Sequence, residues 1–228
     1  MIHIYIDEAG RWPLAWPVYV GLVVCKNNWK SKELQSCKDS KKISHKQREI
    51  LFEQLKYGYI DWSYAKSSSK YIDRYGIVAA IRRAIIQGMR KILCRHCAPW
   101  ASARKCPWGK DVGRSNPGNY TVEKFRDMIT SVDGITLHID GNTDFGLAKK
   151  FPWLLIHTYI KGDDKIPAIS AASIIAKVLR DREMISLHKK YPSYGFAQHK
   201  GYGTQKHRQA IKKHKFSPLH RKTFCKSI

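Results

Sequence analysis

Apolar and polar residues alternate from the second residue of the chain onward. Ile2, Ile4 and Ile6 recur with a period of two, which predicts a strand with one buried face. We expect this strand to stop at two adjacent acids, Asp7 and Glu8. The carboxyl ends of strands are where open α/β sheets commonly present functional groups, so the segment is a candidate site. The alternative is an acidic surface turn.

The same arrangement recurs twice along the chain. An alternating segment over 135–139 leads to Asp140, and an apolar segment over 154–160 leads through a short turn to Asp163. If the three strands lie side by side in one sheet, their four carboxylates converge on one pocket. Converging carboxylates repel one another, so such a cluster is costly without a cation. Oxygen ligands select magnesium or manganese over zinc or copper.

The remaining pattern predicts an α/β fold. Further strands are expected over 18–25 and 60–65, and helices over about 72–93, 121–130 and 169–190. Ser44 and Gln47 have the spacing of a capping box, which predicts the start of another helix. Thr204 is expected to cap a short basic helix near the C-terminal end.

Residues 94–120 break every pattern, with prolines and glycines among scattered basic residues, and are interpreted as a loop insertion. Cys94, Cys97 and Cys106, with His96, could form a zinc knuckle, although a second Cys-x-x-Cys pair is missing. The six cysteines are too irregularly spaced for a secreted disulfide framework. We therefore favour free cysteines in a reducing compartment.

Composition narrows the class of partner. Lysine and arginine number 42 against 18 acidic residues, a formal net charge of +24 over 228 residues. Such an excess indicates a polyanion such as nucleic acid, because neutralising phosphates releases counterions. Solubility tuning is the alternative. No apolar run reaches the length of a membrane span, so we expect a cytoplasmic protein with no membrane partner.

Four segments carry a resemblance to a known family. IDEAGRWPLAWPV, KGDDKIPAISAASIIAKVLRDREM, YPSYGFAQHKGYGTQKH and SPLHRKTF resemble, in this order, motifs of the ribonuclease HII (type 2 ribonuclease H) family. The resemblance covers most of the chain apart from 94–120. It implies a ribonuclease H-like mixed sheet flanked by helices, with a small C-terminal helical subdomain. We accordingly divide the chain into a catalytic domain over 1–190 and a helical substrate-binding segment over 191–228.

The resemblance also implies an activity. The family hydrolyses the RNA strand of RNA–DNA hybrids and cuts on the 5′ side of single ribonucleotides embedded in duplex DNA, leaving a 5′-phosphate and a 3′-hydroxyl. By this resemblance Asp7, Glu8, Asp140 and Asp163 hold Mg²⁺ or Mn²⁺. We expect the protein to act as a monomer on hybrids and on ribonucleotide-containing duplex DNA.

Substrate contacts are expected from three places in the chain. Gly10 and Arg11 match the start of a glycine-arginine-glycine motif that reads the ribose 2′-hydroxyl, and Tyr202 matches a tyrosine that stacks on the sugar at the DNA–RNA junction. The loop with Ser40 and Lys41 is the third place, which by the resemblance holds backbone phosphates. The alternatives are a solvated loop for Ser40 and Lys41 and an exposed turn tyrosine for Tyr202. The candidate residues are Gly10, Arg11, Trp12, Ser40, Lys41, Lys200 and Tyr202.

Tryptophan stands where the family pattern has glycine. This holds for Trp12 and Trp16, and relatives often have glycine at the places of Trp62 and Trp153. Our hypothesis is that the gene uses UGA for glycine, which mass spectrometry of the protein from its native source would test. If Trp12 is genuine, its indole would project into the cleft. The alternative is then an impaired or non-catalytic duplex-binding protein. Independently of Trp12, a junction-resolving nuclease of the same fold is a second alternative.

Overall fold

The structure is a computed structural model that describes residues 2–25, 32–37, 43–58, 60–96, 134–226 and 228. Its strands are β1 (Ile2–Ala9), β2 (Val18–Cys25), β3 (Asp61–Ser67), β4 (Ile135–Asp140) and β5 (Leu155–Tyr159). Its helices are α1 (Lys32–Gln35), α2 (His45–Tyr57), α3 (Ser69–His96), α6 (Leu147–Lys150), α7 (Gly162–Lys165), α8 (Pro167–Lys190), α9 (Phe196–His199) and α10 (Gln205–His214). Short 3-10 helices occupy Pro192–Tyr194 and Lys222–Phe224.

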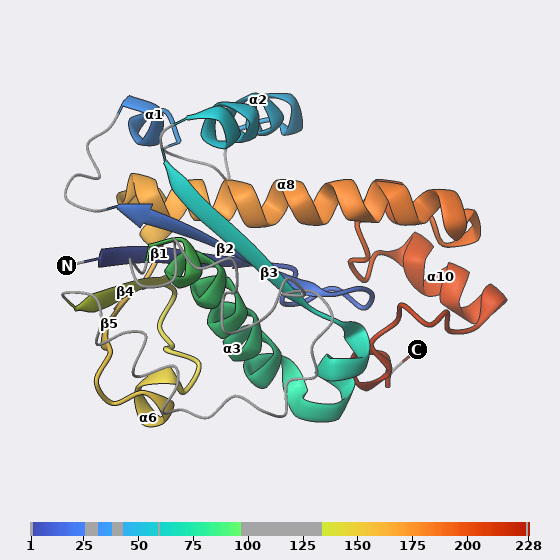
Figure 1. Ribbon diagram of the computed structural model, residues 1–228. Helices are drawn as coiled ribbons and strands as arrows, with labels where there is room; N and C mark the ends of the chain where they lie inside the picture. Colours follow the sequence, from blue (N-terminus) through green and yellow to red (C-terminus); the bar gives the residue numbers. More distant parts are fainter. Residues whose placement is uncertain (1, 26–31, 38–42, 59, 97–133, 227) are drawn as a thin grey trace.

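The five strands form one mixed sheet in the order β3–β2–β1–β4–β5 (Figure 1). β1 pairs antiparallel with β2 and parallel with β4, and β4 pairs parallel with β5. β1 therefore lies at the centre, and the carboxyl ends of three parallel strands meet at one edge. This confirms the predicted α/β architecture and the mixed sheet.

Helices cover both faces of the sheet, with α8 and α3 on opposite sides in Figure 1. The even-numbered residues Ile4 and Ile6 pack with α3, whereas Tyr5 packs on the side of α8. β1 is thus apolar on both faces, as a central strand must be.

Helix α8 lies unusually close to the sheet. A Cβ atom on Gly21 of β2 would stand 2.1 Å from the carbonyl oxygen of Ala172. Only a residue without Cβ permits this approach. The alanines of α8 and this glycine together let the helix backbone contact the strand, which fixes the height of α8 above the sheet.

The observed elements differ from the expected ones at several boundaries. β1 extends to Ala9, so Asp7 and Glu8 lie within the strand and not after it. α3 begins earlier than predicted and is interrupted at Gly76, whose φ is 80°. β5 is largely exposed. The expected helix over 121–130, and Cys97 and Cys106 of the zinc-knuckle alternative, lie outside the described residues.

Both predicted helix caps are confirmed. The Ser44 hydroxyl accepts from the Gln47 amide while the Gln47 side chain accepts from the Ser44 amide. The Thr204 hydroxyl accepts from the amide of His207 at the start of α10. Both devices satisfy amide groups that have no partner inside the helix.

The C-terminal segment is helical and packs against the end of α8 and the loop that follows β1. Their shared apolar cluster is Ala15, Met184, Leu187, Tyr194, Phe196 and Leu219. The division into domains at residue 190 stays a prediction. In the part of the chain that the structure describes, no helix combines the length and apolar character needed to cross a membrane.

Candidate active site

Three of the four predicted acids meet at the carboxyl edge of the parallel strands. Ile6 is in register with Ile139, so Asp7 and Asp140 occupy neighbouring positions on β1 and β4. The amide of Gly162 donates to Asp140 Oδ1 over 2.6 Å. That hydrogen bond holds α7 against the end of β4. Because Asp163 follows Gly162, the fourth acid is brought to the same edge from α7 and not from a strand.

The electrostatics of this edge oppose negative charge. Asp7 is only 4% exposed. Its burial, followed by repulsion from Glu8 and Asp140, raises the pKa of Asp7 well above its ordinary value, while a hydrogen bond from Ser173 of α8 acts in the opposite direction. Burial also raises the pKa of Glu8, and Arg11 at 3.5 Å from its carboxylate partly offsets this.

The four carboxylates are ligands of the chemical type that binds divalent cations. They are hard carboxylate oxygens, and they are partly buried and mutually repulsive, so a bound cation would relieve the repulsion. In the described ranges, however, no three His, Cys, Asp or Glu side chains converge closely enough to hold an ion as they stand. Binding would therefore require the carboxylates to move inward.

The loop after β1 carries the predicted residues Gly10, Arg11 and Trp12. Gly10 has φ +91°, and a Cβ there would stand 2.3 Å from Nε of Arg180. The Arg11 guanidinium lies 5.5 Å from the centre of the Trp12 ring. Trp12 is 74% exposed, so its indole projects from the loop into solvent.

Among the four anomalous tryptophans, Trp16 has a glycine-like backbone. Its φ is +79°, a region that side chains with a Cβ rarely adopt. Its amide donates to Leu219 O over 2.8 Å, and its carbonyl accepts from Arg221 over 2.8 Å, so the tertiary structure fixes this conformation. Trp62, in contrast, lies in β3 with its ring 5.8 Å from that of Phe52. The backbone therefore distinguishes position 16 from position 62.

Two buried arginines hold the loops that carry predicted substrate residues, a role that the sequence did not indicate, since Arg180 was interpreted as part of a local charge network and Arg221 was not considered. The Arg221 side chain donates to the carbonyls of Gly10, Arg11 and Trp16 at 2.7, 2.9 and 2.8 Å. It is fully buried, and burial lowers the pKa of Arg221 to about 9. No periodicity marks this residue in the sequence. Its partners are backbone atoms some two hundred positions away.

Arg180 connects the loop after β1, which carries Gly10, with the loop that carries Lys200 and Tyr202. It donates to Lys200 O over 2.6 Å, and its guanidinium lies 5.5 Å from the centre of the Tyr202 ring. The same side chain fills the space in front of Gly10. A signal for it existed, because Arg180 falls in a stripe of buried α8 residues at intervals of four: Ala172, Ala176, Arg180 and Met184.

The remaining predicted substrate residues have mixed outcomes. Tyr202 is 40% exposed, beside Arg180 and with Lys177 6.0 Å from its ring centre. Lys200 adopts φ +50°, and its ammonium donates to the Ala197 carbonyl. The structure thus brings Gly10 and Tyr202 to one arginine. Ser40 and Lys41 lie outside the described residues.

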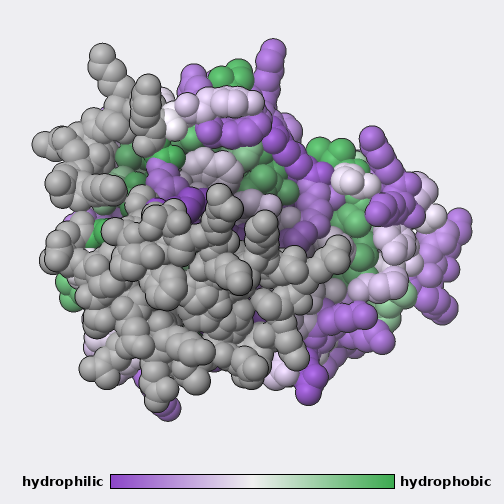
Figure 2. Space-filling view, viewed as in Figure 1, coloured by the Kyte–Doolittle hydropathy of each residue, from purple (hydrophilic) through white to green (hydrophobic). Residues whose placement is uncertain are grey.

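Figure 2 shows hydrophilic residues gathered over the part of the molecule where Figure 1 places α10. Exposed cations on and just after this helix contribute to that surface: Lys206, Arg208, Lys212, Lys213 and Lys215. They extend from the loop that carries Tyr202, so the positive charge adjoins the candidate site.

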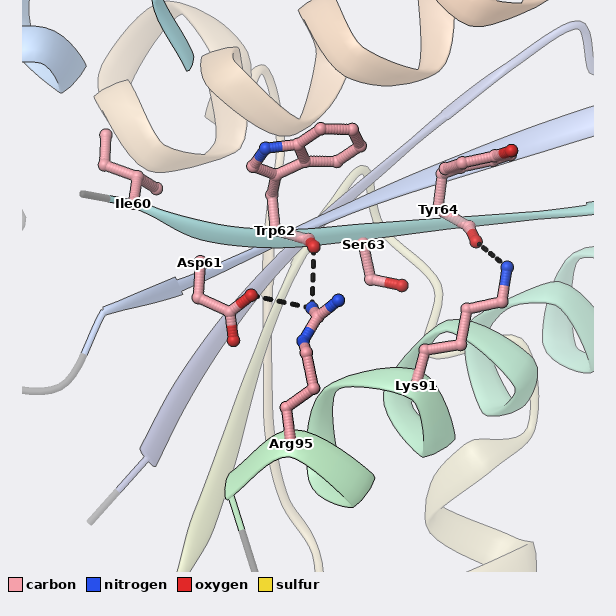
Figure 3. A pocket seen from close by; sticks show the side chains of 7 residues that line it. All are labelled: Ile60, Asp61, Trp62, Ser63, Tyr64, Lys91 and Arg95. Atoms are coloured by element: carbon pink, nitrogen blue, oxygen red, sulfur yellow. Dashed lines mark hydrogen bonds and ion pairs between the residues drawn. The ribbon is translucent and has the colours of Figure 1, made fainter. Parts of the chain in front are cut away.

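A pocket of about 380 Å³ lies elsewhere, between the edge strand β3 and α3 (Figure 3). Lys91 donates to Tyr64 O over 2.8 Å, and Arg95 donates to Trp62 O and pairs with Asp61, both over 2.7 Å. The two cations donate hydrogen bonds to backbone carbonyls of β3. Charged side chains commonly protect edge strands in this way from pairing with another chain. The pocket contains none of the predicted site residues.

Comparison with known proteins decides the family. The family model described as Ribonuclease HII matches residues 4–99 and 120–227. Among curated relatives, the Ribonuclease HII of Endomicrobium trichonymphae is 34% identical over 219 residues, which is 96% of this chain and 83% of the relative. That of Helicobacter pylori is 35% identical over 221 residues, 96% and 89% of the two chains. The chain belongs to the ribonuclease HII family.

The resemblance found in the sequence is thereby confirmed. The protein is a ribonuclease H, an endonuclease that hydrolyses phosphodiester bonds. The family model leaves 100–119 unmatched, an interval within the 94–120 segment interpreted as an insertion.

Solved structures of related enzymes share the fold. The ribonuclease H2 of Pyrococcus horikoshii superposes with a TM-score of 0.62 at 24% identity, covering 98% of this chain and 93% of that chain. The ribonuclease HII in a complex with PCNA from Archaeoglobus fulgidus gives 0.61 at 23%, covering 97% and 94%. A Bst-RNase HIII in complex with Mn²⁺ gives 0.55 at 12%, covering 98% and 64%.

Proposed function

We propose that the protein hydrolyses the RNA strand of RNA–DNA hybrids and cuts on the 5′ side of single ribonucleotides embedded in duplex DNA, leaving a 5′-phosphate and a 3′-hydroxyl. The observation that carries the proposal is the placement of Asp7, Glu8 and Asp140 at one edge of the sheet, next to the Gly10–Arg11 loop. Such an edge suits a cation that bridges protein and phosphodiester.

Asp7, Glu8, Asp140 and Asp163 would hold Mg²⁺ or Mn²⁺. The Mn²⁺ in the related Bst-RNase HIII supports this choice. The bound ion would supply electrostatic stabilisation of the transferring phosphoryl group and a more acidic water. The chain's own contribution is to hold these carboxylates in a partly buried place, where the hydrogen bonds from Ser173 and Gly162 orient two of them.

Substrate recognition falls to the loops that Arg180 and Arg221 fix. The missing Cβ of Gly10 lets Arg180 pack against this loop and fix its backbone, which would suit contact with a ribose 2′-hydroxyl, the group that distinguishes RNA from DNA. Arg11 follows Gly10 on this loop, and its guanidinium lies 3.5 Å from the carboxylate of Glu8 at the end of β1. The half-exposed ring of Tyr202 would stack on the adjoining sugar, with Lys200 and the cations of α10 against phosphates. We propose that the protein acts as a monomer in the cytoplasm.

The test is Asp7→Asn on a duplex that contains one ribonucleotide. We expect cleavage to fall by about a thousandfold or more, because several kcal/mol of metal-dependent stabilisation are lost. Duplex affinity, measured without turnover in Ca²⁺, should change by less than about threefold. Asp164→Asn is the matched control, an exposed acid beside Asp163. Unchanged cleavage by Asp7→Asn would remove Asp7 from the site.

A second candidate function rests on Trp12. Its exposed indole stands on the loop proposed to read the ribose, where it would obstruct a duplex. The protein carrying this residue would then bind duplexes but cleave them poorly. Trp12→Gly should raise kcat/KM on the ribonucleotide-containing duplex by about tenfold or more. A junction-resolving nuclease would instead cut branched DNA that contains no ribose, both with Trp12 and as the Trp12→Gly variant.

A further inference from the structure

A chain of buried hydrogen bonds leads to the backbone of Tyr202. His207 Nδ1 lies 2.9 Å from Tyr202 O. The other nitrogen of this ring, Nε2, lies 3.1 Å from His220 Nε2. His220 Nδ1 in turn lies 3.0 Å from the amide of Ser217 and 2.8 Å from its hydroxyl oxygen. Both imidazoles are buried, at 0% and 3% exposed.

The partners at the two ends fix the protons in between. A carbonyl oxygen can only accept, so His207 Nδ1 carries a proton and donates it to Tyr202. A backbone amide can only donate, so His220 Nδ1 carries no proton. Neutral His220 is therefore protonated at Nε2, and it donates to the bare Nε2 of His207. A second proton on either ring would set two N–H groups against each other.

The surroundings favour neutral rings. Burial lowers the pKa of His207 to about 4 and also lowers that of His220. The ring of His199 stacks on His207 with centroids 4.3 Å apart, and Phe196 meets His207 edge-on. His199 is likewise confined to one tautomer, because Nε2 donates to Tyr194 O and Nδ1 accepts from the Gly201 amide.

The Tyr202 backbone is consequently held from several sides. Its carbonyl accepts from His207 and from the Thr204 amide, and its own amide donates to His199 O over 2.9 Å. The ring alone stays partly free, 40% exposed beside Arg180. The arrangement presents the ring from a rigid base.

We propose that His207 is a positioning residue for Tyr202, and that it acts in a single neutral tautomer imposed by His220 and Ser217. His207 does not touch substrate. It holds the carbonyl of Tyr202, so that the ring keeps the orientation in which it meets the nucleic acid. This rests on the proposed function in one respect, the stacking of Tyr202 on substrate.

The first experiment needs no turnover. Proton–nitrogen correlation spectra of the protein labelled with ¹⁵N in its histidines report which ring nitrogen carries hydrogen. We expect His207 to be protonated at Nδ1 only, and His220 at Nε2 only, at neutral pH. A His207 protonated at Nε2, or one in exchange between tautomers, would overturn the proposal whatever the enzyme cleaves.

The second experiment separates the two ring nitrogens by substitution. In His207→Asn the amide nitrogen stands near the place of Nδ1 and can still donate to Tyr202 O. In His207→Gln the amide lies near the place of Nε2 and reaches His220 instead. We expect His207→Gln to raise KM on the ribonucleotide-containing duplex by about tenfold with kcat little changed, and His207→Asn by no more than about twofold. Equal effects would contradict a role through Tyr202.

A double-mutant cycle distinguishes positioning from general loss of structure. In a Tyr202→Ala background, His207→Gln should raise KM no further, because residues that act as a unit are not additive. Additive effects would refute the proposal. If Tyr202→Ala alone left KM unchanged while the tautomers were as stated, the stacking role of Tyr202 would fail, and the functional part of this inference with it. Thermal melts verify that each variant is folded.

Discussion

Burial and two neighbouring carboxylates oppose the ionisation of Asp7 in the absence of a cation. The folded-state pKa lies above that of the unfolded chain, so the folded protein binds the proton more tightly. Below the unfolded pKa both states are protonated and no penalty exists. As pH rises through the unfolded pKa towards the folded one, the unfolded state loses its proton first, and the free energy of unfolding declines.

This sign predicts the behaviour of a variant. In metal-free buffer, Asp7→Asn should melt at a higher temperature than the parent protein at about pH 8, and the difference should shrink towards about pH 4. Adding Mg²⁺ should raise the melting temperature of the parent more than that of the variant, because the ion binds the folded state. Calorimetry at the two pH values is the measurement. A difference that does not depend on pH would contradict the repulsion described here.

Trp16 and Trp62 make a matched pair for the glycine hypothesis. At position 16, φ +79° strains every residue with a Cβ, so Trp16→Gly should be more stable than Trp16→Ala by about 1 kcal/mol. At position 62, within β3, the order should reverse, with Trp62→Ala more stable than Trp62→Gly by about 0.5–1 kcal/mol. Comparing glycine with alanine removes the contribution of the indole. Chemical denaturation measures both pairs, and the same order at both positions would contradict the argument.

Individual residues were predictable where local pattern determines their place. Asp7 and Asp140 stand at the ends of alternating apolar segments, and the parallel register then sets them side by side. Arg221 was not predictable, because three backbone carbonyls from a remote loop make its buried charge tolerable. His207 was hidden for the same reason. Its partners exist only after the C-terminal segment has folded.

At the scale of elements, the loop after β1 and the segment around 217–221 form one unit. Arg221→Lys keeps the charge but cannot donate to Gly10, Arg11 and Trp16 together. We expect the free energy of unfolding to fall by about 2–4 kcal/mol, with loss of affinity for the ribonucleotide-containing duplex. Arg208→Lys is the control, an exposed arginine that donates to Gly203 O, and it should cost less than about 0.5 kcal/mol. Equal losses in the two variants would argue against the clamp.

Most strands and helices followed from periodicity, and the exceptions have physical reasons. β1 continues through Asp7 and Glu8 because β2 pairs with it as far as Ala9, whereas the pairing with β4 ends at Ile6. The break at Gly76 is a matter of backbone conformation that apolar spacing does not report. β5 is exposed although its sequence is apolar, since it stands at the end of the sheet order in the described structure.

At the scale of the molecule, the charge of +24 and the cations of α10 predict binding that weakens with salt. Between about 50 and 200 mM salt, the logarithm of duplex affinity should fall with a slope of about −3 or steeper. Lys212→Gln should reduce the magnitude of that slope by about one. Lys56→Gln on α2, whose partner is Glu53, should leave it unchanged. Fluorescence anisotropy without catalytic metal measures these slopes. A salt-independent affinity would contradict an electrostatic interface.

The whole architecture could be predicted from the sequence through the family motifs. The side-chain positions that the four carboxylates would take around a bound ion could not. The motifs lie along nearly the full chain, and the mixed sheet they imply is the one observed. Side-chain positions around a cation depend on the cation itself, so neither pattern nor resemblance determines them.

The contact between Arg221 and the loop after β1 has a consequence for biosynthesis. The ribosome makes Gly10 and Trp16 early, yet the guanidinium that orders their backbone is added 205 residues after Trp16. A nascent chain can pair its first strands, but it cannot complete the loop that we propose to contact nucleic acid. The loop therefore gains these three hydrogen bonds only after the late segment has left the exit tunnel and folded.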